Sequence, residues 1–388
     1  MAVNELSFNQ LSTVLAEITS QATGSAVVAP VDTQSFVSVA NTALLTGYDN
    51  IMNAVSQVLS RTVFSVRPYN RKFKGLEVSP VVYGNHIRKL NAIDLPFEDD
   101  DRMSLVDGES VDQYIVRKPK ALQTNYYGEN VLQKHITIFK DQLDAAFSSA
   151  DDFGRFISMI MSNQSDQIEQ SRENVARATI ANLAGGVSKC NASCVFHLVT
   201  LYNSANGTSL TTTTVMHDEN FPSFVRWLSG FLANLVDYLS ERTTLYHLNI
   251  TNNPIMRHTP KSDLKIYMNS AFVNRMLASA YSVTFHENYL KTTDFEKVTF
   301  WQNIGSPYRI NVDCGYINAS GAVQHGEADL QNVIGILFDR EAASICTVNE
   351  WASTSPFNSR GGYINHWYHW TTRFLTDFTE NALVLCLD

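Results

Sequence analysis

The sequence is poor in charged residues for a folded protein of its size. Only 17% of the 388 residues are charged, whereas 44% are hydrophobic, and typical soluble domains are about 25% charged. So few charges suggest that part of the surface becomes buried against a partner. With 29 Lys and Arg against 38 Asp and Glu, the chain also lacks the excess of cations on which dedicated nucleic-acid binding depends. Nonspecific contact with DNA remains open.

Cysteine, targeting signals and long apolar runs are also scarce. Five cysteines in so long a chain predict reduced thiols rather than a disulfide framework. The start, MAVNELSFNQ, has no basic region followed by an apolar core, so we expect no secretory signal. The longest apolar stretch, 221–239, contains Arg226 and Asp237 and is amphipathic. These absences predict a soluble protein that is made in a cytoplasm and has no membrane partner.

Helical spacing of apolar residues appears in four stretches. They are 4–20, 48–59, a long helix over 152–184 that Gly185 and Gly186 would end, and 221–239. Between the first two, residues 19–29 are rich in Ser, Thr, Ala and Gly and predict a linker. We therefore expect the amino end to be two amphipathic helices on a flexible arm.

Short runs typical of β-strands alternate with these helices. They lie at 78–83, 111–116, 263–268, 297–303, 333–338, 345–351, 363–372 and 382–387. The strand at 263–268 is followed at once by an expected helix over 270–280. A chain of this length exceeds the size at which one core usually stops growing. The pattern predicts an α+β protein with a second, α/β-like sub-domain.

Residues 86–120 form the most polar segment of the chain. Fourteen of these 35 residues are charged, so the segment cannot support a core of its own. Its acidic residues come early and its basic residues late, which predicts a projecting β-hairpin whose two ends have opposite charge. The candidate residues for pairing with neighbouring copies are Glu98, Asp99, Asp100, Asp101, Arg117, Lys118 and Lys120. A solvated or disordered surface loop is the alternative.

No catalytic signature is present. The sequence contains no phosphate-binding loop, dinucleotide fingerprint, His-Glu-x-x-His or Gly-x-Ser-x-Gly motif. Cys190, Cys194 and His197 do not have the spacing of a common zinc site, so we expect neither a metal nor another cofactor. His366 and His369 lie among four aromatic residues, which favours a packed strand. A hydrolase that uses His366, His369 and Asp377 is the alternative from a different class.

Three short runs carry a resemblance to a known family. They are residues 71–75 (RKFKG), residues 152–160 (DFGRFISMI) and residues 358–370 (NSRGGYINHWYHW). With the order of the predicted elements, they resemble the Hong Kong-type major capsid protein of tailed phages. The last run looks like the closing segment of head proteins from small short-tailed phages of the Salas-type podovirus group.

The resemblance implies a fold with five parts. They are an amino-terminal arm (1–62), an extended hairpin or E-loop (63–130), a peripheral domain with a spine helix at about 152–184 (131–214), an axial domain (215–335) and a returning β segment (336–388). It implies no enzymatic activity. Copies would assemble in the host cytoplasm as hexamers and pentamers of an icosahedral or prolate phage head that encloses double-stranded DNA. Scaffolding and portal proteins would be its other partners.

Two further classes remain as alternatives. An encapsulin-like nanocompartment shell protein would share the fold but enclose an enzyme cargo. A phage adhesin or tail-surface module would form trimers with glycan affinity.

Overall fold

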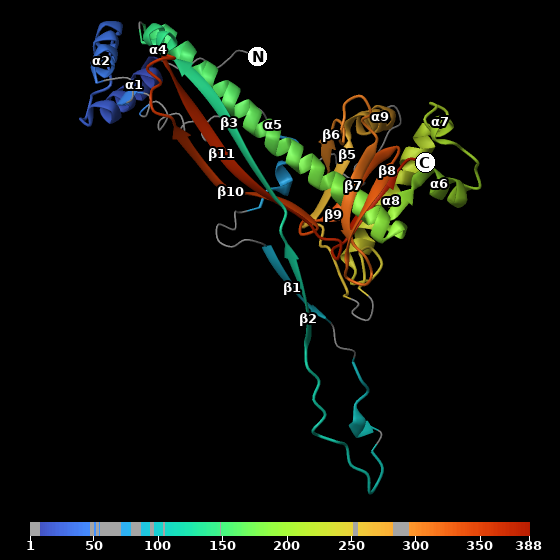
Figure 1. Ribbon diagram of the computed structural model, residues 1–388. Helices are drawn as coiled ribbons and strands as arrows, with labels where there is room; N and C mark the ends of the chain where they lie inside the picture. Colours follow the sequence, from blue (N-terminus) through green and yellow to red (C-terminus); the bar gives the residue numbers. More distant parts are fainter. Residues whose placement is uncertain are drawn as a thin grey trace. The chain divides into compact units, whose positions relative to one another are not determined.

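The fold is seen in a computed structural model that describes residues 8–46, 50–51, 54, 71–78, 87–93, 97–103, 105–147, 149–250, 255–281 and 295–388. The chain divides into two compact units (Figure 1). Unit 1 comprises Met1–Arg71, Glu129–Val175 and Cys346–Arg373, and unit 2 comprises Lys72–Gly128, Ala176–Ile345 and Phe374–Asp388. Each unit therefore combines three segments that are far apart in the sequence.

A three-stranded sheet forms the centre of unit 1, in the order β10 (Ala343–Thr354), β11 (Tyr363–Thr376), β3 (Glu129–Phe139). Strands β11 and β3 are antiparallel and pair from Tyr363↔Phe139 to Arg373↔Glu129. From Tyr363 to Thr372, buried and half-buried residues alternate along β11, as expected when a sheet covers a core with one face. The buried face packs on Ile168 of the long helix through Tyr368 and Trp370. The strands predicted at 345–351 and 363–372 are confirmed.

The amino-terminal helices pack on the rest of unit 1. Helix α1 (Phe8–Thr23) and helix α2 (Thr33–Leu45) share one core with α4 (Lys140–Ala146) and the start of the long helix. The ring of Phe36 meets that of Phe153 at 5.8 Å between centroids. The prediction of a flexible arm is wrong for these residues, because the apolar stripe of α1 and α2 is buried against their own chain.

Helix α2 was not predicted from the sequence. It begins at Asp32, whose carboxylate accepts a hydrogen bond from the backbone N–H of Ser35 at 2.7 Å. The hydrogen bond from the Ser35 hydroxyl, and then the one from its backbone N–H, lower the pKa of Asp32. The linker was also predicted to begin too early, since α1 continues to Thr23. Most of the second expected helix, 48–59, lies outside the described residues.

Helix α5 (Ala150–Cys190) has 41 residues and is about 60 Å long at 1.5 Å per residue. It confirms the long helix but not its predicted end, because the helix passes through Gly185 and Gly186. A Cβ at Gly185 would lie 2.6 Å from Val312, and one at Gly186 would overlap the ring of Phe378. These glycines therefore permit close packing in unit 2 rather than ending the helix.

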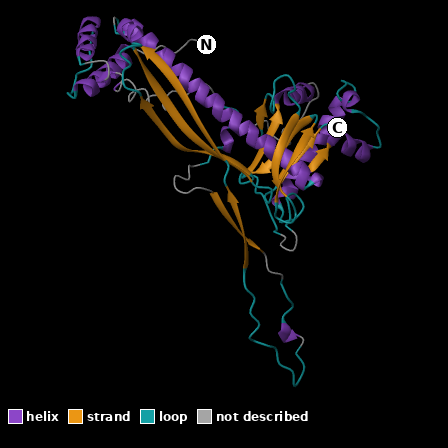
Figure 2. Ribbon diagram, in the orientation of Figure 1, coloured by secondary structure: helices purple, strands orange, loops and turns teal. Residues whose placement is uncertain are grey.

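Unit 2 contains a five-stranded sheet and two β-hairpins (Figure 2). The sheet order is β4 (Val195–His197), β12 (Ala382–Cys386), β9 (Val333–Asp339), β5 (Leu264–Asn269), β6 (Glu296–Val298). Every residue of β9 and β12 is buried, so both faces of these strands are covered. The strands predicted at 263–268, 333–338 and 382–387 are confirmed. The strand predicted at 297–303 ends at Val298.

Helices and a hairpin complete the α/β part of unit 2. The helices are α6 (Leu198–Asn206), α7 (Thr212–Val215), α8 (Phe221–Ser240) and α9 (Ser270–Tyr281), and the hairpin joins β7 (Ile310–Ile317) to β8 (Val323–Leu330). Helix α8 buries a stripe of eight apolar residues and confirms the amphipathic helix predicted at 221–239. Helix α9 confirms the helix predicted at 270–280.

The second hairpin of unit 2 joins β1 (Ile87–Ile93) to β2 (Lys120–Tyr126). A hairpin was predicted here, but its strands were not placed correctly. Residues 111–116 are not a strand, because they lie in the exposed connection, where no second strand pairs with them. Most of the run expected at 78–83 lies outside the described residues.

The close packing at Gly186 can be tested by adding one methyl group. We expect Gly186→Ala to lower the free energy of unfolding by about 1 to 3 kcal/mol, because the Cβ would displace the ring of Phe378. Urea denaturation followed by circular dichroism measures the change. The matched control is Gly230→Ala in helix α8, where nothing lies within 4 Å of an added Cβ and Ala is the better helix former. Equal stability of the two variants would contradict the packing role.

The buried face of β11 predicts a loss of stability in acid. Burial lowers the pKa of His366 from 6.5 to about 4, so the unfolded chain binds a proton that the folded chain excludes. Stability from this residue is therefore complete above pH 6.5 and falls by up to about 3 kcal/mol as the pH drops towards 4. We expect His366→Gln to flatten this part of the pH profile of urea denaturation. His369→Gln, on the other face of the strand, is the control and should keep the slope.

Candidate subunit interface

The hairpin of β1 and β2 is the candidate site, because its connection has no partner layer in its own unit. The seven residue pairs run from Ile87↔Tyr126 to Ile93↔Lys120. Beyond them, the described residues of 97–119 are all exposed, and their regular structure is the short 3₁₀ turn η2 (Asp101–Met103). The sequence prediction of a projecting hairpin is therefore confirmed for its base.

Large apolar side chains are exposed along this connection. Phe97, Met103, Tyr114 and Val116 have relative exposures of 103%, 91%, 80% and 79%. Side chains of this kind, spread over one segment, are typical of a surface that becomes buried in an interface. The connection therefore offers apolar area as well as charge.

The structure places all seven predicted interface residues on this hairpin. Glu98 forms an ion pair with Arg117, so the acidic and basic ends meet within one chain. Arg102 Nε donates a hydrogen bond to Asp100 Oδ1 at 3.0 Å. Lys120 is the first residue of strand β2. Asp99, Asp101 and Lys118 are exposed in the same connection. Contact of these residues with a neighbouring copy remains a prediction.

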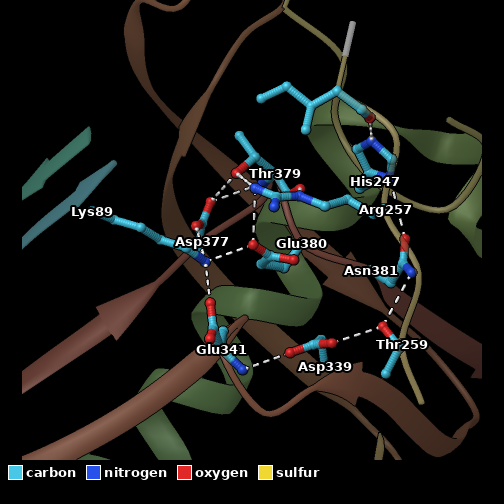
Figure 3. A network of polar contacts seen from close by, with 11 residues as sticks. Lys89, His247, Arg257, Thr259, Asp339, Glu341, Asp377, Thr379, Glu380 and Asn381 are labelled. Atoms are coloured by element: carbon cyan, nitrogen blue, oxygen red, sulfur yellow. Dashed lines mark hydrogen bonds and ion pairs between the residues drawn. The ribbon is translucent and has the colours of Figure 1, made fainter. Parts of the chain in front are cut away.

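The base of the hairpin is held by one lysine. Lys89 Nζ of β1 lies 2.6 Å from Glu380 Oε1, 3.0 Å from Asp377 Oδ2 and 2.9 Å from Glu341 Oε2 (Figure 3). Asp377 and Glu380 are buried, whereas Glu341 is largely exposed. The three ion pairs join the hairpin to residues far away in the sequence, of which Glu380 is 291 positions from Lys89.

The electrostatics of this cluster favour a charged lysine. Burial lowers the pKa of Lys89, but the carboxylates of Asp377 and Glu380 raise it by more, so the net pKa lies above its ordinary value. Burial raises the pKa of Glu380, and Lys89 offsets this only in part. On the second strand, burial and then the charge of Asp377 raise the pKa of Tyr126, which stays neutral. The charge of Asp377 therefore acts on both strands of the hairpin.

A wider polar network fixes the carboxylates themselves. Thr379 donates its backbone N–H and its hydroxyl to Asp377 Oδ1 at 2.9 and 2.7 Å. The guanidinium of Arg257 lies 2.9 Å from Glu380 Oε1. In the adjacent part of Figure 3, Thr259 donates to Asp339 Oδ2 at 2.7 Å. The hairpin is thus anchored to side chains that are already held in place.

The residues of the alternative hydrolase hypothesis all have structural roles. His366 is buried in β11, and His369 stacks on Trp351 at 3.8 Å between ring centroids. Asp377 belongs to the Lys89 cluster.

The two cysteines considered for a zinc site are neutral thiols. Burial raises the pKa values of Cys190 and Cys194 to about 12.

Neither a cluster of metal ligands nor a membrane-spanning helix is present among the described residues. No group of three or more His, Cys, Asp or Glu side chains within these residues is placed to hold a metal ion. Likewise, none of the helices in the described ranges combines the length and apolar character that a membrane crossing requires.

The sequence prediction missed the anchoring residues. Lys89 is one of 14 charged residues between 86 and 120, and nothing in the sequence separates it from its exposed neighbours. A signal was available at Asp377 and Glu380, two acids close to the apolar run 382–387. Carboxylates that close to a buried strand require a cationic partner.

Comparison with known proteins identifies a family. The model of the Phi29-like phage major capsid protein family matches residues 12–386. A search of curated proteins finds no match. A capsid structure of Staphylococcus phage Andhra is 11% identical with a TM-score of 0.53, and the match covers 82% of this chain and 84% of that one.

A second solved structure shows the same likeness. It is that of the head fibre and inner core protein of native bacteriophage P68, with 11% identity, a TM-score of 0.53, and coverage of 82% of this chain and 85% of that chain. At such low identity the two structures show the fold alone, which is the α+β Hong Kong-type capsid fold expected from the sequence.

The family match spans nearly the whole chain, and it specifies a phage head protein rather than a nanocompartment shell, an adhesin or a hydrolase. The predicted short-tailed-phage resemblance and the structural, non-enzymatic role are confirmed. The chain belongs to the Phi29-like phage major capsid proteins, and its function is to build the head of the virion from copies of itself.

Proposed function

We propose that copies of the chain form hexamers and pentamers that close into an icosahedral or prolate head around double-stranded DNA, with each hairpin lying on an adjacent copy. The observation that carries this proposal is the exposed connection 97–119 on an anchored base. Its apolar side chains have no core in their own unit, and burial of such area stabilises association. Small contacts of this kind gain strength when they repeat around a closed ring.

The proposal includes the organisation expected from the sequence. The hairpin region (63–130), the axial domain (215–335) and the peripheral parts (1–62, 131–214 and 336–388) would have separate roles in the shell. Glu98 to Asp101 and the cations Arg117, Lys118 and Lys120 would contribute to the contact between copies. The excess of acidic residues would limit DNA to nonspecific contact. Scaffolding and portal proteins would be partners during assembly in the host cytoplasm.

The apolar contribution of the connection can be tested directly. We expect the purified wild-type chain to form capsomers or shells in electron microscopy and sedimentation, with scaffold supplied where needed. The double variant Tyr114→Ser with Val116→Ser should assemble at least about tenfold less efficiently, because it removes exposed apolar area, while its thermal unfolding stays unchanged. Gln113→Ser, directly before Tyr114 in the same exposed connection, is the matched control. Normal particles from the double variant would show that this segment is not buried on assembly.

The anchor predicts a loss of stability that depends on pH. Lys89→Met would remove the cation of the buried Asp377 and leave Glu380 with Arg257, and we expect a cost of about 3 to 5 kcal/mol in urea denaturation at pH 7. The deficit should shrink as the pH falls, because burial raises the pKa of Glu380 and its protonated carboxyl group no longer requires the cation. Lys118→Met in the exposed connection is the control and should change stability by less than about 0.5 kcal/mol. A pH-independent deficit would contradict the ion-pair role.

A further inference from the structure

A line of hydrogen bonds runs through unit 2 from Asp339 to His247 (Figure 3). Thr259 Oγ1 lies 2.7 Å from Asp339 Oδ2, and Asn381 Nδ2 lies 3.1 Å from Thr259 Oγ1. The amide oxygen of Asn381 lies 3.1 Å from Nδ1 of His247. The other ring nitrogen, Nε2, lies 2.7 Å from the backbone oxygen of Ile255. All four side chains of the line are buried, so their polar atoms depend on one another for hydrogen bonds.

The order of donors along the line is determined by its first acceptor. An ionised carboxylate can only accept, so the single hydroxyl proton of Thr259 points to Asp339. Thr259 Oγ1 then accepts from the amide nitrogen of Asn381, and the amide oxygen faces His247. Both ring nitrogens of His247 thus face oxygen atoms, and each contact requires a proton on the ring. A neutral imidazole carries only one.

Turning the amide of Asn381 around would not supply the missing proton. Its NH₂ group would then donate to His247 Nδ1, but its oxygen would take the hydroxyl proton of Thr259. Asp339 Oδ2 would lose its donor instead. In either orientation, the four contacts require one proton more than a neutral His247 and an ionised Asp339 provide.

The buried charges of the same network also lack one cation. The network contains three buried acids and two largely buried cations, namely Asp339, Asp377 and Glu380 with Lys89 and Arg257. Within the part of the chain that the structure describes, no cation forms an ion pair with Asp339, which accepts from Thr259 and from the backbone N–H of Glu341. A buried carboxylate usually has a cationic partner, and the line leads from Asp339 to His247.

The remaining charges nearby lie closer to the solvent. They line a cleft of about 990 Å³ along strand β1 and consist of Arg88, Arg242, His258, Arg340, Asp263 and Glu341. All of them are exposed except Asp263, which is half-buried. Both signs are present, and water and salt screen exposed charges. These groups therefore do not replace a cation at the buried end of the line.

The groups packed around His247 have opposing effects on its proton. Burial is the largest influence and lowers the pKa of His247, the contacts with Ile255 and Asn381 raise it, and the charge of Arg257 lowers it. Asn191, directly after helix α5, donates to the backbone oxygen of His247 and adds no charge. A neutral ring would, however, leave one of two buried oxygen atoms without a donor, which is costly.

We propose that His247 carries a proton on both ring nitrogens in the folded protein, where it completes the line and supplies the missing cation opposite Asp339. Residues 243–250 and 255–259 are then a pH-sensitive clamp on residues 377–381. The clamp supports the segment whose carboxylates hold Lys89 at the base of the hairpin. The inference concerns a single chain and does not rest on assembly.

The clamp is strongest at low pH. A group that binds its proton more tightly in the folded state than in the unfolded chain stabilises the fold at low pH, and this contribution disappears as the pH rises. At alkaline pH, a neutral His247 leaves the oxygen of Ile255 or of Asn381 without a donor. The effect has the opposite sign to that of His366, whose burial disfavours its proton.

Nuclear magnetic resonance of ¹⁵N-labelled histidine tests the protonation directly, in solution or on assembled particles in the solid state. We expect both ring nitrogens of His247 to be protonated at pH 7, with its signals identified by their absence in His247→Gln. Asp339→Asn should lower the midpoint of the His247 titration by about one pH unit, a tenfold loss of proton affinity, because the new amide can donate to Thr259 and supply the missing proton. Glu341→Gln, an exposed acid beside the line, is the matched control and should leave the midpoint unchanged.

A second pair of variants separates the line from general electrostatics. Thr259→Val interrupts the line without changing a charge and should lower the midpoint of the His247 titration, whereas Thr259→Ser retains the hydroxyl and should keep it. This pair decides the question even where Asp339→Asn does not fold. A neutral His247 in the wild-type protein at pH 7, or a midpoint that does not respond to loss of the Thr259 hydroxyl, would overturn the proposal.

Hydrogen exchange tests whether the proton holds the clamp. The backbone N–H of Leu248 donates to Phe378 at 2.8 Å, and that of Ala382 donates to Tyr246 at 3.0 Å. After correction for the intrinsic exchange rate, protection of peptides that contain these two amides should fall by about tenfold or more as the pH rises through the His247 titration. His247→Gln should abolish this fall, and peptides from helix α8 are the internal control. Protection that does not depend on pH in the wild-type protein would refute the clamp.

Discussion

The contact of Lys89 with two buried carboxylates, those of Asp377 and Glu380, is the constraint on which the hairpin depends. A two-stranded ribbon is marginally stable by itself in water, and its connection contributes no core. The ion pairs with Asp377 and Glu380 lie in surroundings that water screens poorly, and loss of Lys89 would remove the cation of Asp377 and leave Glu380 with Arg257. The polar cluster therefore supplies the rigid base that the small ribbon cannot make with apolar contacts.

Much of the fold could be predicted because its elements have strong periodicity. The stripe of α8 and the continuous apolar strand β9 are determined by local pattern alone. Helix α2 was missed although Asp32 and Ser35 form a capping box at its start. Its many Ser, Thr and Ala residues are as common in linkers as in helices. Gly186 was misjudged for a different reason. Its neighbour Phe378 is almost 200 positions away, and no local pattern reveals such packing.

The interface was only partly predictable for the same reason. Composition located the hairpin, since a segment so rich in charge cannot be buried. The partners of those charges depend on register, and the pair of Glu98 with Arg117 follows from the way the two arms face each other. Lys89 and Glu380 are 291 positions apart, so their contact requires the whole fold of unit 2. The sequence thus indicates which segment projects, and the fold determines which of its charged residues form ion pairs within the chain.

A subunit with an exposed apolar connection must avoid binding at random. Exposed apolar area alone would favour any similar surface, but in residues 97–119 it is combined with sorted charges. Desolvating those charges against a wrong surface is costly, whereas a neighbouring copy that offers opposite charges would compensate them. In the proposed assembly, apolar side chains such as Tyr114 and Val116 would supply much of the binding energy, and the charged residues of the connection the choice of partner and register. This division allows each contact to stay weak, so that a shell can correct errors before it closes.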